Sequence, residues 1–453
     1  MRCGARRAGT PTGHVISEFE NMTTTPVAYP RAGHSAPQMR RLLFCAIIFL
    51  TVTIVAQERT LSIEQAVHLA VERNERTEIA NTGVEVAEAR VGRSRSILLP
   101  QLGISGSYRN DSAADTRNTL STSATLTQPL FDARAFPLIR QARLELDAAR
   151  ATATESHRIL GYDAANAFVA TLNVQQVLEA AGHRRDFARA TLDDARARFE
   201  AGLVSSNDVT KAQLELATAE RVVAQAQGDM LASRVALSNV INAEVGALQE
   251  PVALLTAATQ PVGATGDSVR TAQQRREDIV ARRARAGALR AFSEEPGKRF
   301  IPSLLLNAQT RNINEGAISD RSNDGFVGVA LSWPVFDGGL RRADTRERTA
   351  VARGAELEVE LALRGVEAEI LSASVQLTAE QSAVKLAETA LDAARRNADE
   401  TGELYRQGLA NALEVADANQ RLFEAEVAAV TTRYRMAAAY LALREASGEG
   451  AVE

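Results

Sequence analysis

Glu414 and Asp417 are the side chains of this sequence whose spacing most suggests a chemical role. They lie three residues apart in a segment with helical periodicity, which places both carboxylates on one face of a helix. In a tube built from several symmetric copies, such a pair would form stacked rings of negative charge that attract cations. The alternative is that both are ordinary solvated acids, as most acid pairs on charged helices are.

Other combinations of reactive side chains are missing from the sequence. The histidines beyond residue 57 are His68, His157 and His183, which are widely separated, and no His/Cys cluster has the spacing of a metal site. No glycine-rich phosphate loop follows a strand pattern. We therefore expect no enzyme, no catalytic residue, no cofactor and no metal.

The elements that carry the two acids occur twice. Four landmarks recur 202 to 206 residues apart, namely Pro100 and Pro302, Pro129 and Pro334, Asp132 and Asp337, and Gly202 and Gly408. A tandem duplication explains this, and each repeat is predicted to hold two strands, a long helix, a glycine turn and a second helix. Glycine suits the turn because it accepts the left-handed conformation that ends many helices.

Apolar residues recur at every seventh position along three segments, which begin at Ile139, Leu363 and Val415. Unbroken seams of this kind predict helices that lie along partner helices, as in a coiled coil. No proline interrupts the chain between Pro137 and Pro251. A helix from about residue 137 to 200 would be roughly 95 Å long, far more than the width of a globular domain.

Two segments, at about 98–131 and 301–336, alternate apolar with small or polar residues, as strands do. Each contains a polar stretch, Asn110–Asn118 or Asn312–Gly325, which predicts a loop between two strands of roughly 9 to 11 residues, the length of a tilted membrane strand. Four strands cannot close a membrane barrel, and open edges are costly in lipid. Either the strands are not in a membrane or several chains share one barrel, and three copies would supply twelve strands.

Residues 39–56 have the pattern of a secretory signal peptide, with a basic start, an apolar run and a small residue before Gln57. We expect residues 1–38 to be a non-native upstream extension, with Met39 as the true start. Both cysteines, Cys3 and Cys45, precede residue 57. Lipidation at Cys45 is disfavoured because Phe44, and not a small residue, precedes it. The net charge of -4 and the absence of a dense basic patch predict no nucleic-acid partner.

These patterns divide the chain into two repeats. We predict the first at 57–245 with its helical hairpin tip at 200–207, and the second at 269–446 with its tip at 405–412. Residues 246–268, poor in helical pattern and containing Pro251 and Pro261, are predicted to be a linker. Residues 447–453 are predicted to be a flexible C-terminus.

The order, spacing and duplication of these motifs resemble the TolC-like outer membrane efflux factor family over about residues 60–446. The most specific marks are Phe300–Leu304, Pro334–Gly339 and the doubled tips around Gly202 and Gly408. Arg275–Ile279 looks like the family's Arg-Pro-Asp-Ile element, with Glu277 in place of the proline. The resemblance implies a mainly α fold with a small β part. Long antiparallel coiled-coil helices would form a periplasmic α-barrel, and four strands per chain would enter a shared 12-stranded outer membrane β-barrel in a homotrimer.

The resemblance also implies a function, the exit duct of a tripartite efflux or secretion system in the outer membrane. Its expected partners are a periplasmic adaptor (membrane fusion protein), an inner-membrane transporter of RND or ABC type, and outer membrane lipid. The substrate, and the choice between efflux and protein secretion, stay open. A periplasmic adaptor or a structural coiled-coil protein are alternatives, but neither explains paired and duplicated strands.

Site residues follow from the resemblance at the tips. The positions that match the adaptor-docking pattern are Phe199, Gly202, Leu203, Ser205, Val209, Tyr405, Gly408, Leu409 and Val415. Those that match the periplasmic gate are Asp208, Tyr405, Glu414 and Asp417, where contacts of the Asp208–Tyr405 pair would hold the entrance closed. Ala410 stands where the best-known pattern has arginine, so that link is absent or supplied by Arg406. Trp333 and Phe336 would mark the membrane interface or pack where the sheet meets the helices.

Overall fold

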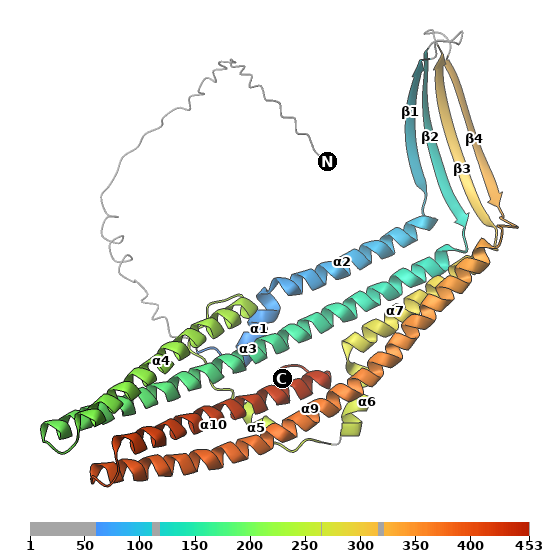
Figure 1. The fold of residues 1–453 in the computed structure, drawn as a ribbon. Coiled ribbons are helices and arrows are strands. Elements are labelled where there is room, and N and C mark those ends of the chain that lie inside the picture. The colour runs from blue at the N-terminus through green and yellow to red at the C-terminus, as the bar shows by residue number, and fades with distance from the viewer. Residues whose placement is uncertain (1–59, 111–117, 264, 316–320, 453) are drawn as a thin grey trace, which may run out of the picture. The chain divides into compact units, whose positions relative to one another are not determined.

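A computed structural model describes residues 60–110, 118–263, 265–315 and 321–452 (Figure 1). The predicted signal peptide, the upstream extension and both cysteines lie outside the described residues. The elements, in chain order, are α1 (Ile63–Arg73), α2 (Glu75–Arg95), the 3₁₀ turn η1 (Ser96–Leu98), β1 (Gln101–Asn110), β2 (Asn118–Phe131), α3 (Ala135–Glu200), α4 (Ser206–Ile241), α5 (Val252–Ala258), α6 (Thr265–Arg275), α7 (Glu277–Ser293), α8 (Glu295–Lys298), β3 (Ser303–Glu315), β4 (Arg321–Ser332), α9 (Leu340–Arg406) and α10 (Ala412–Ala446).

Two long helical hairpins dominate residues 58–453. Helix α3 has 66 residues and reverses into α4, and α9 has 67 residues and reverses into α10. At 1.5 Å per residue each long helix measures roughly 100 Å. Every residue of the three predicted seven-residue seams is buried or half-buried, which confirms the coiled-coil pattern. The strands lie at one end of the long helices and both hairpin tips at the other (Figure 1). None of the helices in the described ranges combines the length and the apolar character needed to cross a membrane.

The helices form a single curved layer with two open sides. Towards the tips the lateral order is α4, α3, α10, α9, and towards the strands it is α2, α3, α7, α9. Helices α3, α7 and α10 therefore have a neighbour on each side. Helices α2 and α4 end the layer on one side, and α9 ends it on the other.

The four strands form one antiparallel sheet in the order β1-β2-β3-β4. They have 10, 14, 13 and 12 residues, so three exceed the predicted length. The predicted second loop was too wide, because β3 and β4 continue through its polar residues. There Arg311 forms an ion pair with Asp324 across the strands, at 2.6 Å. The next pair, Asn312 and Asn323, is hydrogen-bonded on the opposite face, so the polar composition of this stretch marks the polar ends of two strands and not a loop.

The main hydrophobic core lies midway along the helices. It joins α1, the middle of α3, the end of α4, α5 and α10 around side chains such as Tyr162 and Phe168. The predicted linker is not without structure. It contains α5, whose Leu254 and Leu255 are buried in this core, and α6 begins within its last residues. Ala451, in the predicted C-terminal segment, is buried in the same core.

Candidate functional site at the hairpin tips

Both hairpins turn through the same backbone motif. Gly202 and Gly408 have φ of 74° and 79°, in the left-handed region. At the first tip the amide of Gly202 donates to the Phe199 carbonyl and that of Leu203 to the Arg198 carbonyl, both at 2.9 Å. At the second tip the amide of Gly408 donates to the Tyr405 carbonyl at 3.0 Å, and that of Leu409 to the Leu404 carbonyl at 2.8 Å. These are Schellman motifs, which satisfy the last carbonyls of α3 and α9 before the chain reverses.

One predicted gate acid lies in the first turn of the second helix of each hairpin, Asp208 in α4 and Glu414 in α10. Asp208 accepts hydrogen bonds from the backbone amide and the hydroxyl of Ser205, at 3.3 and 3.2 Å. At the equivalent position Glu414 accepts from the amide of Asn411, at 3.0 Å, while the Asn411 side chain caps the amides of Leu413 and Glu414. Both acids therefore occupy the third position of a capping box. Each stabilises the start of its own helix.

The other predicted gate acid, Asp417, lies one turn further along α10. It is exposed and forms an ion pair with Arg421, at 3.0 Å. Glu414 is also exposed. The structure thus leaves both acids accessible to solvent, but a guanidinium lies beside one of them. Because the positive charge of Arg421 offsets that of Asp417, the negative electrostatic potential here is weaker than two unpaired carboxylates would produce.

Tyr405 is not a surface residue. Only 5% of it is exposed, and its ring packs with Ala412 and Val415 inside the second hairpin tip. Burial raises the pKa of its phenol, with a further contribution from the charge of Asp194. Among the residues that the structure describes, the Tyr405 hydroxyl has no hydrogen-bond partner. The Asp208–Tyr405 hydrogen bond is therefore absent from this conformation, since Asp208 is turned towards Ser205.

Arg198, which the sequence did not single out, connects the two tips. Its guanidinium donates to the backbone carbonyls of Tyr405 and Arg406, at 2.8 and 3.2 Å, and lies 4.5 Å from the centroid of the Tyr405 ring. Asp194 on the same helix holds its Nε at 3.0 Å. Arg406, by contrast, pairs with Glu403 on its own helix, so within the chain it does not replace the arginine missing at Ala410.

The predicted docking residues fall into two groups. Phe199, Leu203 and Leu409 project from the tips, with exposed fractions of 47%, 75% and 73%, and Gly202, Gly408 and Ser205 are exposed as well. Tyr405 and Val415 are buried, and Val209 is half-buried against the first hairpin. The buried members shape the tip from inside, and a docking protein would meet the exposed group.

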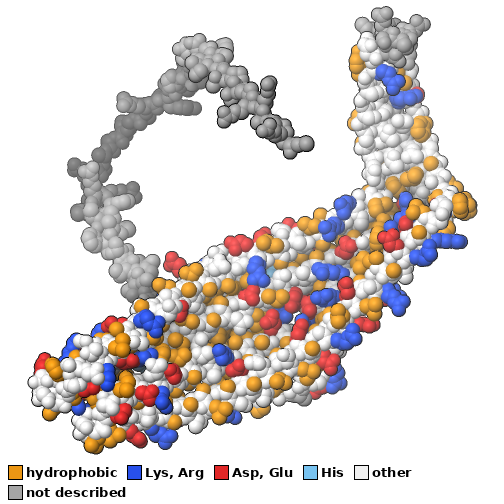
Figure 2. Space-filling model, in the orientation of Figure 1, with side chains coloured by type: hydrophobic (Ala, Val, Ile, Leu, Met, Phe, Trp, Pro, Cys, Tyr) orange, Lys and Arg blue, Asp and Glu red, His pale blue; other side chains and the backbone are white. Residues whose placement is uncertain are grey.

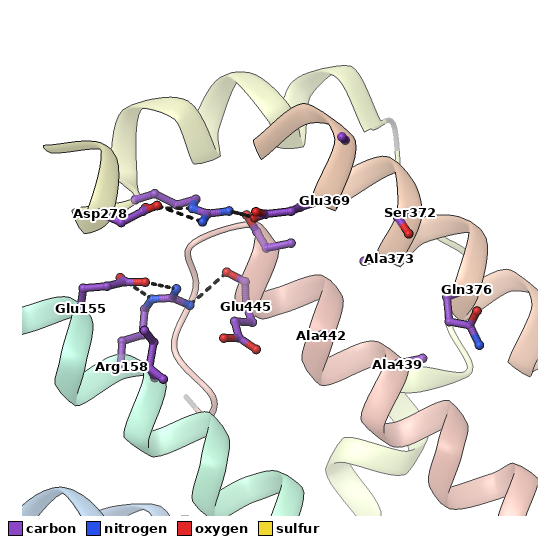
Figure 3. A pocket seen from close by; sticks show the side chains of 14 residues that line it. Glu155, Arg158, Asp278, Glu369, Ser372, Ala373, Gln376, Ala439, Ala442 and Glu445 are labelled. Carbon is purple, nitrogen blue, oxygen red and sulfur yellow. Dashed lines mark hydrogen bonds and ion pairs between the residues drawn. The ribbon is translucent and has the colours of Figure 1, made fainter. Parts of the chain in front are cut away.

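A second polar cluster lies away from the tips, around a groove of about 840 Å³ between α3, α9 and α10 (Figure 3). Arg276, just before α7, holds Asp278 at 3.0 Å and also pairs with Glu369 of α9. Glu277 takes the first position of α7, where proline is also favoured, so the substitution in the Arg-Pro-Asp-Ile pattern keeps the helix start intact. Gly448 lies so close that a Cβ there would be 2.9 Å from Arg276 Cγ.

The other half of this cluster belongs to α3. Arg158 forms hydrogen bonds of 3.0 and 2.7 Å with Glu155 and donates to the Glu445 carbonyl at 3.0 Å (Figure 3). Burial raises the pKa of the Glu445 carboxyl, and the charges of Asp163 and Glu155 add to the shift against that of Arg158. The cluster joins the two repeats and the C-terminal segment. No group of three or more potential metal ligands occurs within the described residues.

Comparisons with known proteins agree with this geometry. A family model described as "Outer membrane efflux protein" matches residues 66–243 and 269–449. Outer membrane protein TolC of Vibrio cholerae is 25% identical over 375 residues, covering 80% of this chain and 85% of TolC. Outer membrane efflux protein BepC of Brucella suis is 23% identical and covers 90% of both chains. The crystal structure of VceC, also from Vibrio cholerae, matches with a TM-score of 0.69 at 20% identity, covering 86% of this chain and 96% of VceC.

Proposed function

The chain belongs to the outer membrane efflux protein family, and from this premise we propose that three copies close side by side into one continuous tube. As a member of the family it is an outer membrane channel with a helical tunnel in the periplasm, and it serves as an exit duct for efflux or secretion. The main support for a trimer is that the helical layer and the sheet have their open edges on the same two sides of the chain.

The open sides of the helical layer are apolar. The 3.6-residue period of α9 brings a stripe of exposed apolar residues onto one face, which consists of Leu357, Leu361, Leu371, Val375 and Leu386. The opposite side, on α2 and α4, exposes Ile79, Val86, Leu214, Leu231 and Val235. Different surfaces that complement each other form a head-to-tail contact, which closes into a ring when the rotation allows. Each α9 would then pack against α2 and α4 of the next copy.

The open edges of the sheet lie on the corresponding sides, with β1 on the side of α2 and β4 on the side of α9 (Figure 1). Unpaired strand edges in lipid are costly, so β4 of one copy would pair with β1 of the next. Two copies would give eight strands, a barrel whose interior side chains fill. Three copies are the smallest number that leaves a water-filled passage.

The two faces of the sheet differ as such a barrel requires. One face carries apolar side chains in register, such as Leu102 opposite Leu126, and Leu306 opposite Val329. The other is polar, with hydroxyl pairs Ser105–Ser123 and Ser107–Ser121 at 2.9 Å. We infer that the apolar face contacts lipid and the polar face lines the passage.

Exposed aromatic residues gather where the sheet meets the helices, and they are Phe131, Phe136, Phe300, Trp333 and Phe336. Hydrophobic side chains are dense at this level in the space-filling view (Figure 2). Trp333 and Phe336 are 58% and 86% exposed, and the Trp333 indole also donates to the Phe300 carbonyl at 3.1 Å. Aromatic rings favour the boundary between lipid and water, which supports the interfacial alternative for this pair.

The tips are the proposed contact with the periplasmic adaptor, through Phe199, Leu203 and Leu409, which project into solvent. An inner-membrane transporter of RND or ABC type would supply the energy. Nothing in the part of the chain that the structure describes indicates a substrate class, so we propose that the transporter determines it.

The proposed trimer can be tested by substitutions on the exposed apolar face of α9. Detergent-extracted protein is expected to have the mass of three chains, and Leu371→Glu with Val375→Glu should abolish the trimer by placing two charges in the contact. Phe187→Glu is the matched control, because Phe187 is exposed on α3, which has a neighbour on each side. Light scattering measures the masses. A monodisperse monomer with native strand content, or an edge variant that stays trimeric, would contradict the proposal.

A further inference from the structure

The two tips of one chain are packed separately. Near the ends of the hairpins one apolar cluster holds Leu192, Ala195 and Ala212, all from the first hairpin. The other holds Tyr405, Ala412 and Val415, all from the second. Between them lies a groove of about 490 Å³ that both hairpins line. Hydrophobic packing therefore stabilises each tip but does not hold one tip to the other.

Polar contacts from α3 join the two hairpins. Arg184, which lies outside this groove and further from the tips, donates to Gln420 at 3.0 Å and lies 5.3 Å from the centroid of the Phe423 ring. Arg198, two heptads further towards the tip on the same face of α3, makes the contacts with the Tyr405 and Arg406 carbonyls described above. Those carbonyls belong to the last turn of α9, where a cation also favours the helix dipole. Arg198 thus caps a helix of the other hairpin.

The buried Tyr405 hydroxyl does not stabilise this arrangement of the tips. It has no partner among the described residues, and a buried polar group without a partner destabilises the state that buries it. The ring of Tyr405, in contrast, supports Arg198 by stacking. The hydroxyl and the ring of Tyr405 therefore have opposite effects on the stability of the arrangement in which the two tips are in contact.

We infer that Arg198 holds the two tips of each chain together, in place of an Asp208–Tyr405 hydrogen bond. We call its contacts with the carbonyls of Tyr405 and Arg406 and with the Tyr405 ring the latch. The inference rests on the proposed function and deepens it, because it names a contact that must break if the second hairpin moves away from the first at the periplasmic end of the tube. Arg198 binds through its side chain, and its acceptors are backbone carbonyls. Substitutions at Asp208 or Arg406 therefore leave the latch in place.

The latch is tested by measuring the distance between the tips. Spin labels at Leu203→Cys and Leu409→Cys, both exposed positions, are placed in the full chain with Cys3→Ser and Cys45→Ser. Labelled chains are diluted with unlabelled ones so that pulsed dipolar spectroscopy reads the distance within one chain. Arg198→Gln should raise the population with separated tips roughly tenfold or more, because it removes two hydrogen bonds from a charged donor. Arg196→Gln, an exposed arginine on the same helix, should not.

Two further variants define the contact. Arg198→Lys should behave like Arg198→Gln, because an ammonium neither spans both carbonyls nor stacks as a guanidinium does. Tyr405→Phe keeps the ring and removes the unpaired hydroxyl, so its tips should stay as close as in the wild type. Unchanged distances in Arg198→Gln would overturn the inference, and so would tips opened by Tyr405→Phe.

Single-channel conductance separates the latch from the proposed function. Arg198→Gln trimers in planar bilayers should conduct more often or at a higher level than wild type. If wild-type protein forms no trimeric channel, the proposed function fails, while the spin-label distances still report on Arg198. If wild type conducts and Arg198→Gln conducts identically with unchanged distances, only the latch fails.

Discussion

At the hairpin turns, one backbone angle per tip decides whether the chain can reverse. Gly408 has φ of 79° with open space where a Cβ would lie, so Gly408→Ala would be strained by conformation and not by collision. We expect it to cost about 1 kcal/mol of stability at the tip, and to reduce export and adaptor crosslinking while the trimer persists. Gly402→Ala is the control, because Gly402 is helical with no close neighbour and alanine favours helix. Normal export by the Gly408 variant would show that the turn geometry is not needed.

The entrance acids call for a different measurement. In the proposed trimer, Glu414 and Asp417 would form rings of carboxylates, which should make the channel cation-selective and open to block by trivalent cations from the periplasmic side. Glu414→Gln with Asp417→Asn should weaken the block, whereas Arg421→Ala should strengthen it by removing the ion pair with Asp417. Glu388→Gln, on the exposed surface of α9, is the control. The measurement is channel conductance with trivalent ions added on the periplasmic side. An unchanged block in the double variant would show that these acids act only at the start of the helix and not on the passing ions.

The sequence contained part of this information at the residue scale. Ser205 with Asp208, and Asn411 with Glu414, have the spacing of capping boxes, so the roles of both acids at helix starts were open to prediction from local pattern. Arg198 was not, because its partners are carbonyls of a residue pair more than 200 positions away. No local periodicity records such a contact.

At the scale of elements, prediction succeeded where one period runs for many residues. The seams starting at Ile139 and Leu363 identified α3 and α9, and the alternation identified all four strands. It missed short ordered segments that depend on tertiary packing. Helix α5 and the C-terminal Ala451 are ordered because they complete a core formed by α1, α3 and α10, which no local pattern shows.

The faces of the sheet give a prediction of their own. Val329 lies on the apolar face opposite Leu306, and Thr127 lies on the polar face opposite Asn307, at almost the same height. If the apolar face contacts lipid, Val329→Arg should destabilise the inserted protein by up to about 2–4 kcal/mol, the cost at the membrane midplane, and reduce insertion. Thr127→Arg should insert normally. Membrane fractionation after mild extraction compares them, and equal insertion of both variants would contradict the assignment of faces.

At the scale of the whole molecule, the cluster that joins the two repeats should make stability depend on pH. Glu445 faces Glu155 and Arg158 of α3 and Arg276 ahead of α7, and its burial raises its pKa above the ordinary value of 4.5. The folded protein therefore favours the protonated acid, and ionisation destabilises the fold at pH values above the raised pKa. Glu445→Gln should raise the melting temperature at neutral pH, and the gain should vanish below about pH 4.5.

Melting curves from pH 4 to 8 check this prediction, with Glu388→Gln as the exposed control. A gain that persists unchanged at acidic pH would mean that the glutamine packs better and that the charge is not the cause.

The two unlike sides of the chain also have a genetic consequence. In a ring of three head-to-tail contacts, each copy uses both of its sides, so one copy with a spoiled α9 face leaves a gap that no other copy closes. When normal and defective copies are made in equal amounts and mix freely, only about one ring in eight consists of normal copies alone. An allele that damages one edge should therefore be dominant over the normal allele, whereas an allele that prevents synthesis should be recessive. Inheritance alone would then distinguish an interface mutation from a loss of the protein.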